Sequence, residues 1–175
     1  MLPNNAPNFP SRVAEAAKLL PGLHWEGPGW AGWAVLPCWG GKELPFNIDP
    51  EDEAADIAPR QLAILRAVLN HSLDIRPALQ DALFAYYKAE IEGSYVAYDP
   101  VARRDIPGSG PPVLTNSSQV WSLIDDPEVC IDWLFHTPAA VEFKLIFNCA
   151  WDEEHGLGVQ FSDWVPVRFG AFDVW

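Results

Sequence analysis

The densest group of side chains that could perform chemistry is Asp152-Glu153-Glu154-His155, which lies between Trp151 and Gly156. Carboxylates and an imidazole can bind a metal ion, and a Glu–His pair can exchange protons near neutral pH. Four consecutive residues of a tight turn cannot all point at one ion, however. An Asp followed by charged residues and Gly is typical of a turn, with Gly at positive φ. We therefore expect a solvent-exposed hairpin turn at Asp152 to His155 without a metal, and keep a small hydrolase that uses these residues as the alternative.

Other catalytic and metal-binding patterns do not occur in the sequence. Neither HExxH nor HxH spacing is found, and no two cysteines lie within four residues of each other, so no zinc motif is present. There is no GxSxG, GxxxxGK or GxGxxG motif, and Ser109 lies in a proline-rich stretch instead of between a strand and a helix. The sequence therefore predicts no catalytic residue, no metal and no cofactor.

Composition limits the partners. The chain has 175 residues, with 24 acidic against 11 basic side chains and a net charge of −13. Such a field repels nucleic-acid phosphates and anionic lipids. Three scattered cysteines indicate a reducing compartment, and no signal peptide or long apolar stretch is found. We expect a cytoplasmic protein that binds neither nucleic acid nor membrane; the sequence sets no oligomeric state.

Periodicity predicts the helices. Residues 1–10 contain three prolines and form a predicted flexible arm, followed by a short helix from Ser11 to Leu20. Apolar residues at helical spacing predict a helix from Pro59 to about Asn70 and a second from Asp74, with Pro77 in its first turn, to Gly93. Residues 93–115 show no period and are a candidate contact loop, and a further short helix is expected after Asn116.

Alternating apolar and polar residues predict the strands. Segments 30–36 and 43–48 flank Gly40-Gly41, which suits a two-residue hairpin turn, and Pro37 and Pro45 place these strands at an edge or a bulge. Segments 128–135, 141–151, 157–162 and 165–170 should form one antiparallel sheet whose odd-numbered apolar side chains pack on the helices of 59–92. Residues 11–175 are thus predicted to be a single α+β domain, an antiparallel sheet of four or more strands with a helical hairpin on one face.

Acidic and aromatic residues are the candidate partner-binding groups. The acidic excess lies in residues 1–57 and 116–175, and residues 49–56 are predicted to be a solvated loop. An acidic surface accelerates association with a basic partner, and Trp side chains often anchor protein interfaces. A simpler interpretation is that the charge only keeps the protein soluble and that the Trp residues fill the core. The candidates are Asp49, Glu51, Asp52, Glu53, Asp56, Asp125, Asp126, Trp30 and Trp33.

Two parts of the sequence resemble a known group of proteins. They are the helical pair, from Pro59 to Asn70 and ending at Ala85-Tyr86-Tyr87, and the segment WDEEHGLGV from Trp151 to Val159. Over residues 25–170 the chain resembles small bacterial domains of unknown function that recur among proteins regarded as immunity proteins of polymorphic toxin systems. The resemblance implies an α+β fold and a non-enzymatic role. The leading hypothesis is an immunity protein that binds and neutralises a cognate toxin domain, which the acidic charge predicts to be basic. The alternatives are the hydrolase and a structural or adaptor module.

Overall fold

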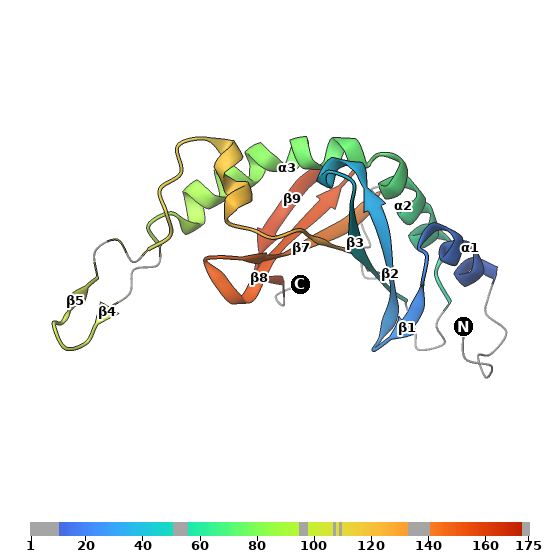
Figure 1. Ribbon diagram of the computed structural model, residues 1–175, viewed down its shortest axis with the longest axis horizontal. Helices are drawn as coiled ribbons and strands as arrows, with labels where there is room; N and C mark the ends of the chain where they lie inside the picture. Colours follow the sequence, from blue (N-terminus) through green and yellow to red (C-terminus); the bar gives the residue numbers. More distant parts are fainter. Residues whose placement is uncertain are drawn as a thin grey trace.

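The protein has two layers, a seven-stranded sheet and a helical layer that covers one face of it (Figure 1). The computed structural model describes residues 11–50, 56–94, 98–106, 108, 110–132 and 141–172. The strand order is β1-β2-β3-β6-β7-β8-β9. The predicted α+β class, with helices on one face of the sheet, is confirmed. The predicted arm at residues 1–10 lies outside the described residues.

The first half of the sheet follows a short helix. Helix α1 (Ser11–Leu19) precedes β1 (His24–Glu26), β2 (Gly29–Leu36) and β3 (Lys42–Asp49). The hairpin between β2 and β3 forms, but its loop has five residues instead of two. A 3-10 turn at Pro37–Trp39 precedes Gly40 and Gly41, whose φ values of 68° and 74° reverse the chain. These two glycines provide the positive φ values that the sequence predicts.

The edge position predicted for β2 and β3 is wrong, because both strands have a neighbour on each side. Strand β2 pairs with β1 and β3, and β3 pairs with β6 (Glu128–Asp132) in parallel. Pro45 is tolerated in β3 because its pairing with β6 begins only at the next residue, Phe46. At Pro45 the missing N–H therefore costs no hydrogen bond to β6.

The helical hairpin consists of α2 (Pro59–Asn70) and α3 (Ser72–Tyr86), and a π-helical turn, Tyr87–Ile91, extends α3. The predicted bounds of α2 are confirmed, with Pro59 at its first position. Helix α3 starts two residues earlier than predicted, so Pro77 lies inside the helix instead of in its first turn. The reason is the connection, since only His71 separates the two helices and its N–H donates to the Ala67 carbonyl at 2.9 Å.

The second half of the sheet contains β6, β7 (Glu142–Cys149), β8 (Asp152–Ser162) and β9 (Val165–Gly170), which pair antiparallel in this order. The predicted antiparallel arrangement of these four segments is confirmed. The whole sheet is mixed, however, because the β3–β6 pair is parallel. The last residues of the predicted strand 128–135 lie outside the described residues.

The odd-numbered apolar side chains of β6, β7 and β8 are buried, as the alternation predicts, and they include Phe143, Leu145, Phe147, Val159 and Phe161. The prediction is wrong for β9, where Val165 and Val167 are 58% and 54% exposed. Between Gln160↔Arg168 and Phe161↔Pro166 the register skips Val167, which is a β-bulge. The extra residue changes which side chains face the core. Beyond the bulge Phe169 does face the helices, and its ring stacks on Tyr86 with centroids 5.1 Å apart.

The segment after α3 leaves the body of the protein and returns to it. A small hairpin, β4 (Tyr98–Asp99) and β5 (Arg104–Asp105), projects away from the two layers, whereas the sequence predicts no regular structure there (Figure 1). The short helix after Asn116 is a 3-10 helix, Ser117–Ser122. Within the described ranges, no helix has the length and apolar character needed to cross a membrane.

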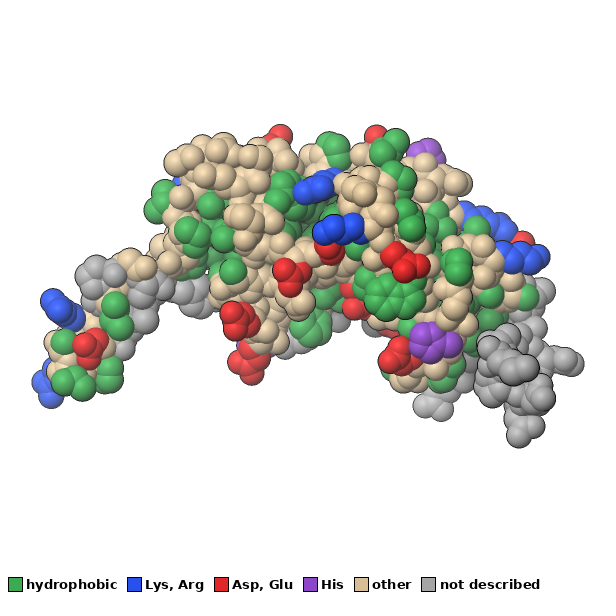
Figure 2. All heavy atoms as spheres, viewed as in Figure 1, with side chains coloured by type: hydrophobic (Ala, Val, Ile, Leu, Met, Phe, Trp, Pro, Cys, Tyr) green, Lys and Arg blue, Asp and Glu red, His purple; other side chains and the backbone are tan. Residues whose placement is uncertain are grey.

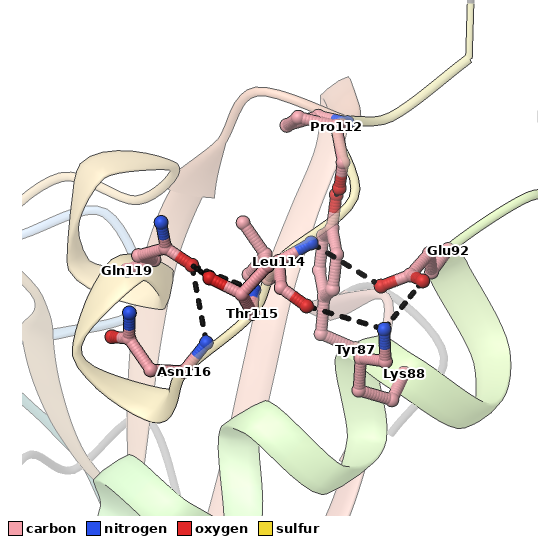
Figure 3. A network of polar contacts seen from close by, with 8 residues as sticks. All are labelled: Tyr87, Lys88, Glu92, Pro112, Leu114, Thr115, Asn116 and Gln119. Carbon is pink, nitrogen blue, oxygen red and sulfur yellow. Dashed lines mark hydrogen bonds and ion pairs between the residues drawn. The ribbon is translucent and has the colours of Figure 1, made fainter.

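Polar contacts hold the returning segment against the end of α3 (Figure 3). The Tyr87 hydroxyl donates to the Pro112 carbonyl at 2.7 Å, and Lys88 Nζ donates to the Leu114 carbonyl at 3.2 Å. Glu92 accepts a hydrogen bond from the Leu114 N–H and forms an ion pair with Lys88. The base of the projecting hairpin is therefore fixed to the helical layer.

Candidate functional site

The described helices leave one face of the sheet uncovered, and this face is the candidate site (Figure 1). Because side chains alternate along a strand, residues next to the core positions point to this second face, here called the open face. Its central strands form a groove of about 500 Å³. The groove is lined by residues of β1, β2, β3, β6 and β7, which include His24, Glu26, Gly29, Trp33, Asn47, Asp49, Glu128, Cys130 and Ile146.

Strand register brings the acidic side chains of the open face together. Asp49 at the end of β3 lies opposite Asp132 at the end of β6. On the other side of β6, Cys130 is opposite Lys144, and Lys144 Nζ lies 3.7 Å from Asp132 Oδ2. The side chains of this pair are only 13% and 14% exposed. Asp49 and Glu128 line the groove, and the largely buried Asp132–Lys144 pair lies beside it.

The charges of the groove repel one another. Desolvation raises the pKa of Asp49 above its ordinary value of 3.8, and the neighbouring Asp132 and Glu128 raise it further, while Lys144 opposes this rise. Desolvation and Glu128 raise the pKa of the Cys130 thiol far above its usual range. Cys130 is thus a poor nucleophile, because the thiolate is the reactive form.

Two residues place the Asp49 carboxylate where it is. Gly29 on β2 leaves room for it, since a Cβ atom there would lie 2.5 Å from Asp49 Oδ1. Gln61 on α2 is 2% exposed, and its Nε2 donates to the Asp49 carbonyl at 2.6 Å and to the Ile131 carbonyl at 3.2 Å. Its Oε1 accepts from the Ala58 N–H at 3.0 Å. Gln61 therefore joins the start of α2 to the ends of the parallel strands.

The structure does not bring the predicted acidic residues to one place. Asp49 belongs to β3 and is half-buried, so its assignment to a solvated loop is wrong. Asp126 forms an ion pair of 2.7 Å with Lys42, at the other end of β3, and its neighbour Asp125 is exposed. Asp56 is partly buried in an ion pair with Arg12. The remaining predicted acids, Glu51, Asp52 and Glu53, lie outside the described residues.

The two candidate Trp residues face opposite sides of the sheet, because they are three positions apart on β2 and side chains alternate along a strand. Trp30 is 3% exposed and packs edge-to-face on Trp25, with ring centroids 5.3 Å apart. Its prediction as a partner-binding residue therefore conflicts with its burial in the core. Trp33 is 47% exposed on the open face.

Sequence reasoning missed three charged residues of the open face, Glu128, Asp132 and Lys144. The signal that could have found them is the alternation itself, which already placed the even-numbered residues of β6 and β7 opposite the core. Their proximity to Asp49 depends on the parallel pairing of β3 and β6, which no local pattern indicates.

Asp152 to His155 are the first residues of β8. The hairpin turn therefore lies before the predicted segment, at Ala150-Trp151. Asp152 Oδ1 accepts the His155 N–H at 3.0 Å and lies 3.1 Å from His155 Nδ1. The backbone hydrogen bond from His155 is the main reason why the pKa of Asp152 is lowered. Gly156 has the expected positive φ, 61°. The described ranges contain no group of three or more His, Cys, Asp or Glu side chains placed to hold a metal ion.

Comparison with known proteins gives a family but no activity. The family model described as "Domain of unknown function (DUF6985)" matches residues 20–175, which include the whole sheet, both long helices and the open face. Neither the curated proteins nor the solved structures include a match to the chain. The chain belongs to the DUF6985 family.

Proposed function

We propose that this protein is an immunity protein that neutralises a cognate bacterial toxin domain by stoichiometric binding through the open face. The observation that carries the proposal is the groove of this face, which Asp49 and Glu128 line and beside which the Asp132–Lys144 pair lies. A basic protein surface complements such a groove. The resemblance of the helical pair and of Trp151 to Val159 to immunity proteins supports a toxin as the partner.

The distribution of charge also supports the open face as the binding surface. In the view of Figure 2, acidic side chains lie mainly below the helical layer, whereas basic ones lie mainly along that layer and on the projecting hairpin. With a net charge of −13, long-range attraction accelerates the encounter with a basic partner. Trp33 adds an exposed aromatic anchor beside the acidic groups.

The chemistry of the groove favours binding over hydrolysis. Burial and Glu128 hold the pKa of Cys130 high, so that a thiolate nucleophile is disfavoured. Lys144 lies 3.7 Å from Asp132, and both side chains are largely buried. The alternative Asp152–His155 pair lies at the start of β8 and does not line this groove.

The test is co-expression with a candidate toxin domain from a neighbouring gene, followed by co-purification and stopped-flow association kinetics. We expect growth to be rescued, a one-to-one complex, and association that slows about tenfold or more between low and physiological salt, because exposed charges are screened beyond ~8 Å at 0.15 M. Dissociation should depend on salt much less. Failure to rescue growth or to co-purify contradicts the proposal. Rescue at far below a one-to-one ratio also contradicts it and favours the hydrolase.

A further inference from the structure

We infer that the groove of the open face receives a Lys or Arg side chain from an extended basic segment of the partner, whose aliphatic stem packs on Trp33. The inference rests on the proposed function and specifies how the open face is used. The occupant is a cationic protein side chain, because no described helix covers this face and carboxylates line its groove.

The first argument is charge imbalance within the groove. Lys144 lies 3.7 Å from Asp132, and within the described part of the chain no Lys, Arg or His lies within ion-pair distance of Asp49 or Glu128. Glu128 instead accepts from the Asn47 side-chain amide and from the Cys130 thiol. Both of these donors are neutral. An added cation would relieve the repulsion between Asp49, Glu128 and Asp132, which the folded protein otherwise retains.

The second argument is the position of apolar surface beside the acids. Trp33 and Val35 on β2 are 47% and 55% exposed and lie on the same side of the sheet as Asn47 and Asp49. Lys and Arg have apolar stems that cover such surface while their charged ends reach polar groups. The face of a Trp ring also attracts a cation. A basic residue therefore suits a groove that is lined by the Trp33 ring and by the carboxylates of Asp49 and Glu128.

The third argument is that the groove is already organised. Gly29 allows the Asp49 carboxylate to lie against β2, and Gln61 holds the Asp49 backbone from the helical layer. Glu128 and Cys130 are fixed by pairing with β3 and β7. A partner therefore meets a rigid sheet surface, so little conformational entropy is lost on binding.

The first experiment uses the complex with the toxin. We expect Asp49→Asn, Glu128→Gln and Trp33→Ala each to weaken binding about tenfold or more, mainly through faster dissociation. The matched controls Asp81→Asn and Glu153→Gln remove the same charge from exposed sites outside the groove, and should change affinity less than about threefold. Circular dichroism melting confirms that each variant is folded. Equal effects of groove and control variants overturn the inference and leave the proposed function standing.

The second experiment does not need the toxin. Blocked five-residue peptides with one central Arg, Lys or norleucine among glycines are titrated into the ¹⁵N-labelled protein and followed by NMR. We expect the Arg and Lys peptides, but not the norleucine peptide, to shift the Asn47 side-chain amide and the Trp33 indole signals. These shifts should be lost in Asp49→Asn. Shifts spread evenly over all acidic surfaces overturn the inference. Groove-specific shifts combined with no toxin binding retain the inference and contradict the proposed function.

Discussion

Asp49 is a residue whose ionised side chain opposes folding. Its carboxylate is half-buried beside Asp132 and Glu128, with Lys144 as the nearby opposing charge, and its pKa is therefore raised. In the unfolded chain the pKa returns to its ordinary value of 3.8. Above the folded pKa, the ionised group therefore destabilises the folded state relative to the unfolded one. A site that is kept unfavourable in this way usually has a functional reason.

We predict that Asp49→Asn raises the melting temperature at pH 7, although it weakens partner binding. The gain should shrink as the pH falls through the raised pKa of Asp49, and it should vanish below about pH 3.8, where the carboxyl is protonated in both states. Differential scanning calorimetry from pH 7 to pH 3.5 measures it. Asp81→Asn controls for the change in net charge. A lower melting temperature at pH 7, or a gain that is independent of pH, contradicts the prediction.

Gly156 is a residue whose type the fold requires. Its φ is 61°, and a Cβ atom there would lie 2.6 Å from the Phe147 carbonyl oxygen, a backbone atom that cannot move aside. The glycine thus allows β8 to approach β7 after the irregular segment between Asp152 and Leu157.

We predict that Gly156→Ala lowers the free energy of unfolding by about 2–4 kcal/mol, from left-handed strain of about 1–2 kcal/mol together with the clash. Gly22→Ala is the matched control. Gly22 has a φ of 80° but no atom within 4 Å of the added Cβ, so only the strain should appear. Urea unfolding measures both variants. Equal losses in the two would show that the contact with Phe147 has no energetic weight.

At the scale of elements, local sequence patterns do not predict the junction between α2 and the β3–β6 pair. Parallel strands need a long connection, here the helical layer and the projecting segment between β3 and β6. Gln61 links α2 to the two parallel strands by hydrogen bonds to the backbone of Asp49 on β3, of Ile131 on β6 and of Ala58 before α2. A buried polar side chain with three backbone partners is a structural residue, and none of its neighbours in sequence indicates this role.

We predict that Gln61→Met costs about 2–4 kcal/mol of unfolding free energy, because it leaves buried backbone groups without partners at a site that is 2% exposed. Arg66→Met on the same helix is the control. Arg66 forms an exposed 2.7 Å ion pair with Glu15, and its loss should cost less than about 1 kcal/mol. Chemical denaturation measures both, and similar costs for the two variants would refute the structural role of Gln61.

At the scale of the whole molecule, the charge of −13 acts on folding as well as on association. Like charges repel within the compact state, and dissolved salt screens this repulsion. The acidic residues of the open face and those at the start of β8 both contribute to the field.

We predict that the melting temperature rises by a few degrees between about 10 mM and about 150 mM NaCl, over which the Debye length falls from ~30 Å to ~8 Å. The double variant Glu153→Gln/Glu154→Gln removes two exposed charges and should reduce this dependence on salt. Calorimetric melting at constant pH measures the change. A melting temperature that falls with salt would mean that attractive ion pairs dominate over the net repulsion.

The sequence by itself determined the two-layer α+β class, helix α2, the four C-terminal strands and most of their core residues. These features follow from periodicity, because burial on one face repeats every 3.6 residues in a helix and every two in a strand. The positive φ of Gly40, Gly41 and Gly156 also followed from local chemistry, since only glycine adopts this conformation without strain.

Only the tertiary structure decided which residues form the candidate site. The parallel pairing of β3 with β6 places Asp49 opposite Asp132, and these residues are 83 positions apart in the sequence. The bulge at Val167 exposes side chains that alternation assigns to the core, and the register of β2 buries Trp30 while it exposes Trp33. Pairing partners and bulges depend on contacts between distant segments, so a local pattern cannot specify them.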